Sequence, residues 1–134
     1  AFEDFVLEEL ELQKGEFVPI NVAGGPAALA HTNVKFSDYM YLSGQIRFFI
    51  DHFKTIDRIV IIGHQYCGYY RTIKGHEDRE KDDLTIAAET ICTRVTDGAI
   101  KVESYYARFT DKSCDRIVFE TIPQAAEIGL SEAV

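Results

Sequence analysis

A histidine and a cysteine three residues apart, His64 and Cys67, lie in a short stretch bounded by Gly63 and Gly68. An imidazole nitrogen and a thiolate are ligands that zinc prefers in proteins, and one tight turn can bring both to a single ion. The two glycines would leave the backbone free to make that turn. The spacing alone is a weak signal, because such a pair more often has a structural role, so its weight depends on the surrounding elements.

The elements before this turn predict an α/β arrangement. Residues 43–56 predict an amphipathic helix, whose apolar side chains recur at i, i+3, i+4 and i+7: Ile46, Phe49, Ile50 and Phe53. Residues 58–62 follow as an uninterrupted apolar run, which is typical of a strand buried on both faces of a parallel sheet. His64 and Cys67 come directly after this strand, and open α/β sheets bind ligands at the carboxyl ends of their strands. The context therefore favours a metal site.

Two other segments predict strand and loop. Residues 17–22 read as a short strand at an edge or irregular position, because Pro19 cannot donate a ladder hydrogen bond. Residues 75–83 are almost entirely charged or polar, and a stretch of that kind predicts a solvated surface loop. The charged segment is not expected to carry chemistry of its own.

The second half of the chain predicts more helix and one more strand. Residues 84–95 carry apolar side chains at helical spacing, and the helix is expected to resume over residues 99–109. Residues 116–119 predict a second buried strand. We therefore expect an α/β fold, a mostly parallel sheet flanked by helices, in a single domain over residues 1–134.

Composition restricts the partners. Fourteen basic residues against 22 acidic ones give a net charge of -8, and the basic residues are scattered, so nucleic acid is not expected as a partner. Three cysteines, Cys67, Cys92 and Cys114, form no disulfide framework, which favours the cytoplasm. No apolar run approaches the length of a membrane span, and the acidic start lacks the order of a secretory signal, so no membrane contact is expected.

Two segments and the helix between them resemble the β-class carbonic anhydrases. Members of that family carry a strand of the type G-D-L-F-V-x-R-N-A-G-N, then a helix, then a strand ending in G-H-x-x-C-G. Residues 15–25, 43–56 and 58–68 resemble these three parts in that order. The likeness is close over residues 15–73 and covers the rest only in outline. It implies a β-carbonic anhydrase-like domain in which His64 and Cys67 take the places of two zinc ligands.

The chain departs from the family pattern at the third ligand. Family members bring it from an upstream C-x-D-x-R motif, whose Asp and Arg lie beside the metal-bound water, and this sequence contains no such motif. The usual family interval places that cysteine at or just before Ala1. We expect either that residues upstream of Ala1 supply the motif or that the site has lost it. The strand-loop also differs, with Asn21-Val22 in place of Arg-Asn and Gly25 in place of the last Asn.

Several residues of the chain could substitute for the missing ligand. Glu3 and Asp4 rank first, because they lie where the family motif would run. Cys92 is expected to pack in the core, since it lies on the apolar stripe of its helix. Cys114 precedes a strand whereas His64 follows one, which in a parallel sheet would place them at opposite ends. The remaining histidines, His31 and His52, are expected to have surface roles.

A complete site of this kind implies reversible, zinc-dependent hydration of carbon dioxide to bicarbonate, because zinc lowers the pKa of a bound water to about 7. Two alternatives stay open: a non-catalytic homologue that serves as a binding or assembly module, and a zinc hydrolase of another small heterocumulene such as carbon disulfide. A phosphate loop at residues 23–25 is disfavoured, since it lacks the G-x-G-x-x-G spacing and a Walker lysine. The resemblance also implies a homodimer or a larger homo-oligomer.

Overall fold

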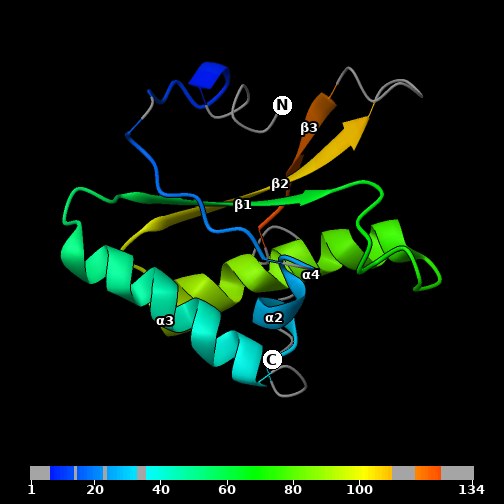
Figure 1. Cartoon of the computed structure of the whole chain (residues 1–134), viewed down its shortest axis with the longest axis horizontal. Coiled ribbons are helices and arrows are strands. Elements are labelled where there is room, and N and C mark those ends of the chain that lie inside the picture. The colour runs from blue at the N-terminus through cyan, green and yellow to red at the C-terminus, as the bar shows by residue number, and fades with distance from the viewer. Residues whose placement is uncertain (1–6, 14, 23, 33–35, 110–116, 125–134) are drawn as a thin grey trace.

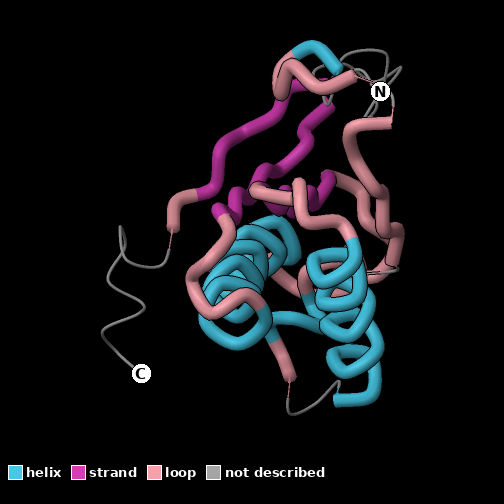
Figure 2. Tube along the Cα trace, turned by 90° about the vertical axis from the view of Figure 1, so that its left-hand side faces the viewer, coloured by secondary structure: helices cyan, strands magenta, loops and turns pink. Residues whose placement is uncertain are grey.

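The computed structural model of the chain describes residues 7–13, 15–22, 24–32, 36–109 and 117–124. These residues form two layers, a small sheet on one side and a group of helices packed against one of its faces (Figures 1 and 2). None of the described helices is long and apolar enough to cross a membrane.

Within the described residues, the sheet has three strands in the order β1-β2-β3. Strand β1 (Arg58–His64) runs parallel to β2 (Lys101–Phe109), with His64 opposite Ala107. Strand β3 (Ile117–Ile122) runs antiparallel to β2, with Phe109 opposite Ile117. The predicted α/β class is confirmed at this level, whereas the sheet seen in the described residues is small and mixed rather than mostly parallel.

In the described part of the chain, four helical segments cover one face of the sheet: α2 (Ala27–Ala30), α3 (Phe36–His52), α4 (His76–Thr90) and the π-helix η1 (Ile91–Val95). The main apolar core lies between α3, α4, η1 and the sheet, and its buried residues are Leu29, Leu42, Ala87, Ala88, Ile91, Val95 and Val102. The predicted helix over residues 84–95 and its apolar stripe are therefore confirmed.

The helix predicted over residues 43–56 is shifted along the chain. It begins at Phe36 and ends at His52, and its only buried residue is Leu42. Ile46 packs against the core as predicted, but Phe53 lies beyond the helix and is 48% exposed. The prediction extended the apolar stripe too far toward the carboxyl end, because the last turn of the helix does not pack against the core.

The prediction of a solvated loop over residues 75–83 is wrong. Gly75 has a φ of 70° at the amino-terminal cap, and α4 starts at His76, directly after it. Glu77 and Asp78 occupy the first turn, where carboxylates interact favourably with the helix dipole. Two further carboxylates of this charged stretch, Glu80 and Asp83, face inward and are buried.

The prediction that the helix resumes over residues 99–109 is also wrong. Asp97 and Gly98 have φ values of 53° and 75°, and these left-handed conformations end the helical segment. The chain then extends as β2, where Val102, Ser104 and Tyr106 are buried on the face that the helices cover.

Strand β1 is confirmed, but the prediction that both of its faces are buried is wrong. Only Gly63 is buried, because the helices cover one face and the other is half-exposed. The second predicted strand is confirmed in part as β3, whose residues are half-buried or exposed except for the buried Ile122. Residues 17–22 do not form a strand, and Val18, Ile20 and Val22 are exposed. Within the described part of the chain, this segment pairs with no strand.

Candidate metal centre

The turn that carries both predicted ligands lies at the carboxyl end of β1. His64 is the last residue of the strand, as expected, and Cys67 follows in the turn. Tyr66, between them, has a φ of 62°, so a tyrosine and not one of the two glycines takes the left-handed conformation. Its ring is exposed and stacks on Phe109, with ring centroids 5.8 Å apart.

Gly63 is required by packing rather than by the turn. A Cβ atom at this position would lie 2.8 Å from Glu80 Oε2 and 2.9 Å from Leu84 Cδ1. Any larger side chain would therefore force the buried side chains of Glu80 and Leu84 to shift. The close approach brings the middle of α4 directly behind the end of the strand that carries His64.

The imidazole of His64 is held in a tautomer that suits metal binding. Its Nδ1 lies 2.9 Å from the carbonyl oxygen of Gln65. Because a carbonyl only accepts hydrogen bonds, Nδ1 carries the proton, and in the neutral ring the lone pair then belongs to Nε2. Metal-binding histidines in proteins are commonly fixed in this way.

Cys67 has the environment of a buried, unoxidised thiol. It is 8% exposed, forms no disulfide, and packs with Ala27 and Tyr70 in a small apolar cluster. The donor set of the turn, one imidazole and one sulfur, fits zinc.

Polar contacts hold the turn on its outer side. The side-chain amide of Gln65 donates to Glu77 Oε1 at 3.0 Å, and its carbonyl oxygen accepts from the Phe109 backbone N–H at 3.0 Å. Arg108 Nη1 donates to the other oxygen of Glu77 at 3.1 Å. The hydrogen bond from Gln65, and after it the one from Arg108, lowers the pKa of Glu77. The turn is thereby fixed to both α4 and β2.

Two buried carboxylates of α4, Glu80 and Asp83, hold the turn on the side that faces the helices. Glu80 Oε2 accepts the backbone N–H of His64 at 3.1 Å, and burial raises the pKa of Glu80. Asp83 Oδ2 accepts the hydroxyl of Tyr70 at 2.6 Å, while its Oδ1 lies 2.9 Å from His31 Nε2. The sequence reasoning missed both carboxylates. Their i, i+4 spacing to Leu84 and Ala87 is the one signal in the sequence, and it places them on the inner face only once residues 75–83 are known to be helical.

Strand β2 places a further polar atom behind the strand end. Tyr106 lies opposite Gly63 in the register, is fully buried, and has a hydroxyl with no hydrogen-bond partner among the described residues. Lys81 Nζ and Arg108 Cζ lie 5.2 and 5.4 Å from the centre of its ring. Burial raises the pKa of Tyr106, so the hydroxyl remains protonated at neutral pH.

The described residues do not complete a metal shell. Among them, no group of three or more His, Cys, Asp or Glu side chains is placed to hold an ion. Cys92 packs against the core, as predicted. Glu3, Asp4 and Cys114 lie outside the described residues. The argument against Cys114 was wrong, because β3 is antiparallel to β2 and therefore starts at the same end of the sheet as His64.

The other two histidines have different surroundings. His52 is exposed at the end of α3, where its ring stacks on Phe48 with centroids 4.0 Å apart, so its predicted surface role is confirmed. His31 is not a simple surface residue, because it contacts the buried Asp83. This contact joins the end of α2 to the inner face of α4.

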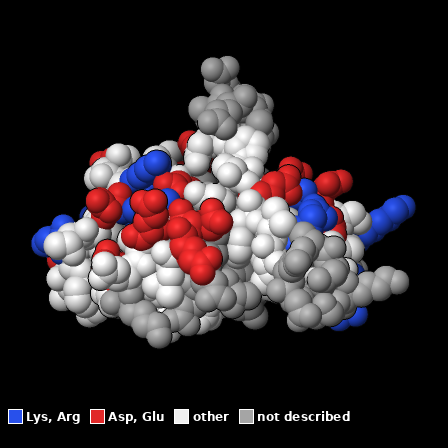
Figure 3. All heavy atoms as spheres, turned by 90° about the horizontal axis from the view of Figure 1, so that it is seen from above, with Lys and Arg blue, Asp and Glu red and all other residues white. Residues whose placement is uncertain are grey.

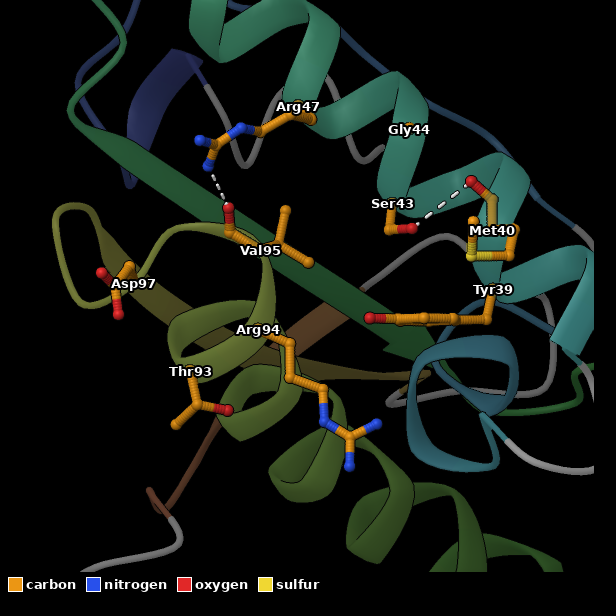
Figure 4. Close-up of a pocket in the computed structure, with 9 residues that line it drawn as sticks. All are labelled: Tyr39, Met40, Ser43, Gly44, Arg47, Thr93, Arg94, Val95 and Asp97. Atoms are coloured by element: carbon orange, nitrogen blue, oxygen red, sulfur yellow. Dashed lines mark hydrogen bonds between the residues drawn. The ribbon is translucent and has the colours of Figure 1, made fainter.

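A separate cleft of about 530 Å³ lies between α3 and η1 and includes neither predicted ligand. It contains two arginines, which point to different sides of it (Figure 4). Arg47 donates to the carbonyl oxygen of Val95, and Arg94 donates to the hydroxyl of Thr32 at 3.2 Å. The two guanidinium groups therefore do not converge on one point of the cleft.

Comparison of the chain with protein-family models, with curated proteins and with solved structures finds no match in any of the three.

Proposed function

We propose that the protein binds zinc through His64 and Cys67 and catalyses the reversible hydration of carbon dioxide to bicarbonate, in a fold of the β-carbonic anhydrase type. The observation that carries this proposal is the strand-end turn. It presents an imidazole, with its Nδ1 proton held by the Gln65 carbonyl, and a buried thiol three residues later. That pair is part of the donor set of a catalytic zinc site.

The chain's own residues would hold and orient the ion. His64 and Cys67 would bind it, and the third ligand would come from residues outside those that the structure describes. Zinc, when bound, lowers the pKa of water to about 7 and so supplies hydroxide at neutral pH for attack on carbon dioxide. The Gln65–Glu77 and Glu80–His64 hydrogen bonds would keep the two ligands in place. We further propose a cytoplasmic homodimer or larger homo-oligomer.

A second candidate is a non-catalytic homologue that uses the same fold as a binding or assembly module. The observation that favours it is the lack of a three-donor group among the described residues. The two candidates differ in one measurable property, which is the zinc content of the purified chain.

Elemental analysis of the full-length protein, together with any residues that precede Ala1, and of its His64→Ala and Cys114→Ser variants separates these candidates. We expect about one zinc per chain in the parent and a large loss in His64→Ala. Retention of zinc in Cys114→Ser is expected if the third ligand lies upstream, as the resemblance implies. A parent without zinc would exclude the catalytic proposal and leave the binding module.

Activity is then measured as carbon dioxide hydration by the zinc-loaded protein. A rate no better than buffer, with zinc confirmed bound, would refute carbonic anhydrase activity. Competition between carbon dioxide and carbon disulfide in the same assay distinguishes the remaining possibility, a zinc hydrolase of another heterocumulene.

A further inference from the structure

Helix α4 buries two carboxylates against the turn that carries the predicted zinc ligands. Glu80 and Asp83 are 2% and 1% exposed, and residues three apart share one face of a helix. Burial of a charged group is unfavourable unless a partner compensates it. Leucine or alanine would fill the same positions without that penalty, so the reason for the two carboxylates must lie in what they contact.

Each carboxylate is connected to a different member of the ligand pair. Glu80 accepts the backbone N–H of His64 at 3.1 Å. Asp83 accepts the hydroxyl of Tyr70 at 2.6 Å, and Tyr70 packs against Cys67 in a buried cluster. One face of α4 therefore fixes the strand end through Glu80 and the cysteine side of the turn through Tyr70.

The two carboxylates differ in how their charge is compensated. Asp83 Oδ1 lies 3.4 Å from Arg79 Nε and 2.9 Å from His31 Nε2. Among the described residues, by contrast, no Lys or Arg nitrogen lies within 4.0 Å of the Glu80 carboxylate. A buried negative charge without a cationic partner favours a cation bound close by.

We propose that Glu80 and Asp83 are positioning residues of the metal site, which hold His64 and Cys67 in a fixed arrangement and place negative charge behind them that favours a divalent cation. This inference rests on the proposed zinc function, since it concerns the groups behind two of the zinc ligands. Groups that hold metal ligands typically contribute about 10- to 100-fold to metal affinity.

The test compares zinc affinity with the stability of the metal-free chain. Zinc affinity is measured by competition with a chromophoric chelator, and unfolding is measured in urea with excess chelator. Glu80→Gln keeps an oxygen that can accept the His64 N–H but removes the charge. We expect zinc affinity to fall by about 10-fold or more. The metal-free variant should be as stable as the parent or more stable, because an uncompensated buried charge is gone.

Glu103→Gln is the matched control. Glu103 pairs with Arg58 at 2.9 Å, at the opposite end of β1 from His64. We expect this variant to lose stability in urea and to bind zinc with unchanged affinity. A purely structural role for Glu80 would give the same pattern as Glu103, with stability lowered and affinity retained.

Tyr70→Phe tests the other half of the proposal and does not depend on the folding of Glu80→Gln. It keeps the ring that packs on Cys67 and removes the hydroxyl that Asp83 accepts, so zinc affinity is expected to fall several-fold. Parent-like zinc affinity in both Glu80→Gln and Tyr70→Phe would overturn the positioning role while leaving the proposed function intact. The parent is measured first, because a parent that does not bind zinc would overturn the proposed function and this inference together.

Discussion

The two faces of the sheet are stabilised in different ways. On the face that the helices cover, Leu84 packs with Tyr106 and Ile122 in a buried apolar cluster. On the opposite face, Arg58 donates to both oxygens of Glu103, at 3.0 and 2.9 Å. Viewed from the side opposite the helices, acidic side chains gather in patches with basic ones beside them (Figure 3).

The contrast shows that the apolar run of β1 does not determine how deeply each face is buried. Neighbouring residues of this strand point to opposite faces, so the same residue type meets an apolar core on one side and a half-exposed polar surface on the other. Two pairs of variants, and one variant compared with the parent, make the comparison quantitative.

The largest difference is expected between two adjacent isoleucines of β1. Ile61 packs against both apolar clusters on the helix side, while Ile62 points to the opposite face. We expect Ile61→Ala to lower the free energy of unfolding by about 2 to 4 kcal/mol, because it leaves a cavity in the core, and Ile62→Ala to lower it by about half as much or less. Urea unfolding of both variants measures this. Equal losses would mean that the opposite face is packed as tightly as the helix face.

A smaller difference is expected between two tyrosine hydroxyls that donate to carboxylates at the same distance. Tyr70 donates to Asp83 at 2.6 Å in a buried position, and Tyr105 donates to Glu103 at 2.6 Å in a partly exposed one. We expect Tyr70→Phe to lower the free energy of unfolding by about 1.5 to 3 kcal/mol and Tyr105→Phe by about 0.5 to 1.5 kcal/mol. Thermal or urea unfolding would reveal any reversal of that order, which would contradict the contrast between the faces.

These contacts also explain which parts of the fold could be predicted from the sequence. The helix over residues 84–95 and the strand over residues 58–62 were predictable, because unbroken apolar patterns indicate their period directly. Residues 75–83 were not, since Glu80 and Asp83 occupy inner positions of α4 where the pattern expects apolar side chains. Judged by hydrophobicity alone, such a stretch is predicted to be a solvent-exposed loop.

In strand β2, too, a buried polar residue hides the pattern by which the element could be predicted. Ser104 occupies a buried position between Val102 and Tyr106, and its hydroxyl donates to the carbonyl oxygen of Leu84 at 3.1 Å. A polar residue at a core position hides the period of two, and the segment was assigned to helix. The partner that satisfies the hydroxyl lies 20 residues earlier in the chain. Only the tertiary structure brings the two together.

The candidate site also has residues that the sequence pattern indicates and residues that only the tertiary structure identifies. His64 and Cys67 could be proposed from their spacing and from the strand before them. The residues behind them could not, because Glu80 and Tyr70 reach the turn through tertiary contacts. The reason for Gly63 was also hidden, since it depends on how closely α4 approaches.

The smallest of the three effects concerns acid stability and comes from the ion pair on the open face. The hydrogen bond from Arg58 is the main cause that lowers the pKa of Glu103 from 4.5 to about 2. Because the folded-state pKa lies below the unfolded one, the contribution of Glu103 is present above about pH 4.5 and is lost as the pH falls through about 2. Solvent screens this partly exposed pair, so we expect a contribution of about 1 kcal/mol.

Urea unfolding of the parent and of Glu103→Gln over this acidic range measures that contribution. The difference between the two proteins should be largest at about pH 5 and should shrink toward zero below about pH 2, where Glu103 is protonated in both states of the parent. A difference that stays constant over the whole range would show that the glutamate stabilises the open face by packing alone. Both faces of the sheet would then be stabilised mainly by packing, and they would differ only in how much packing contributes to the free energy of unfolding.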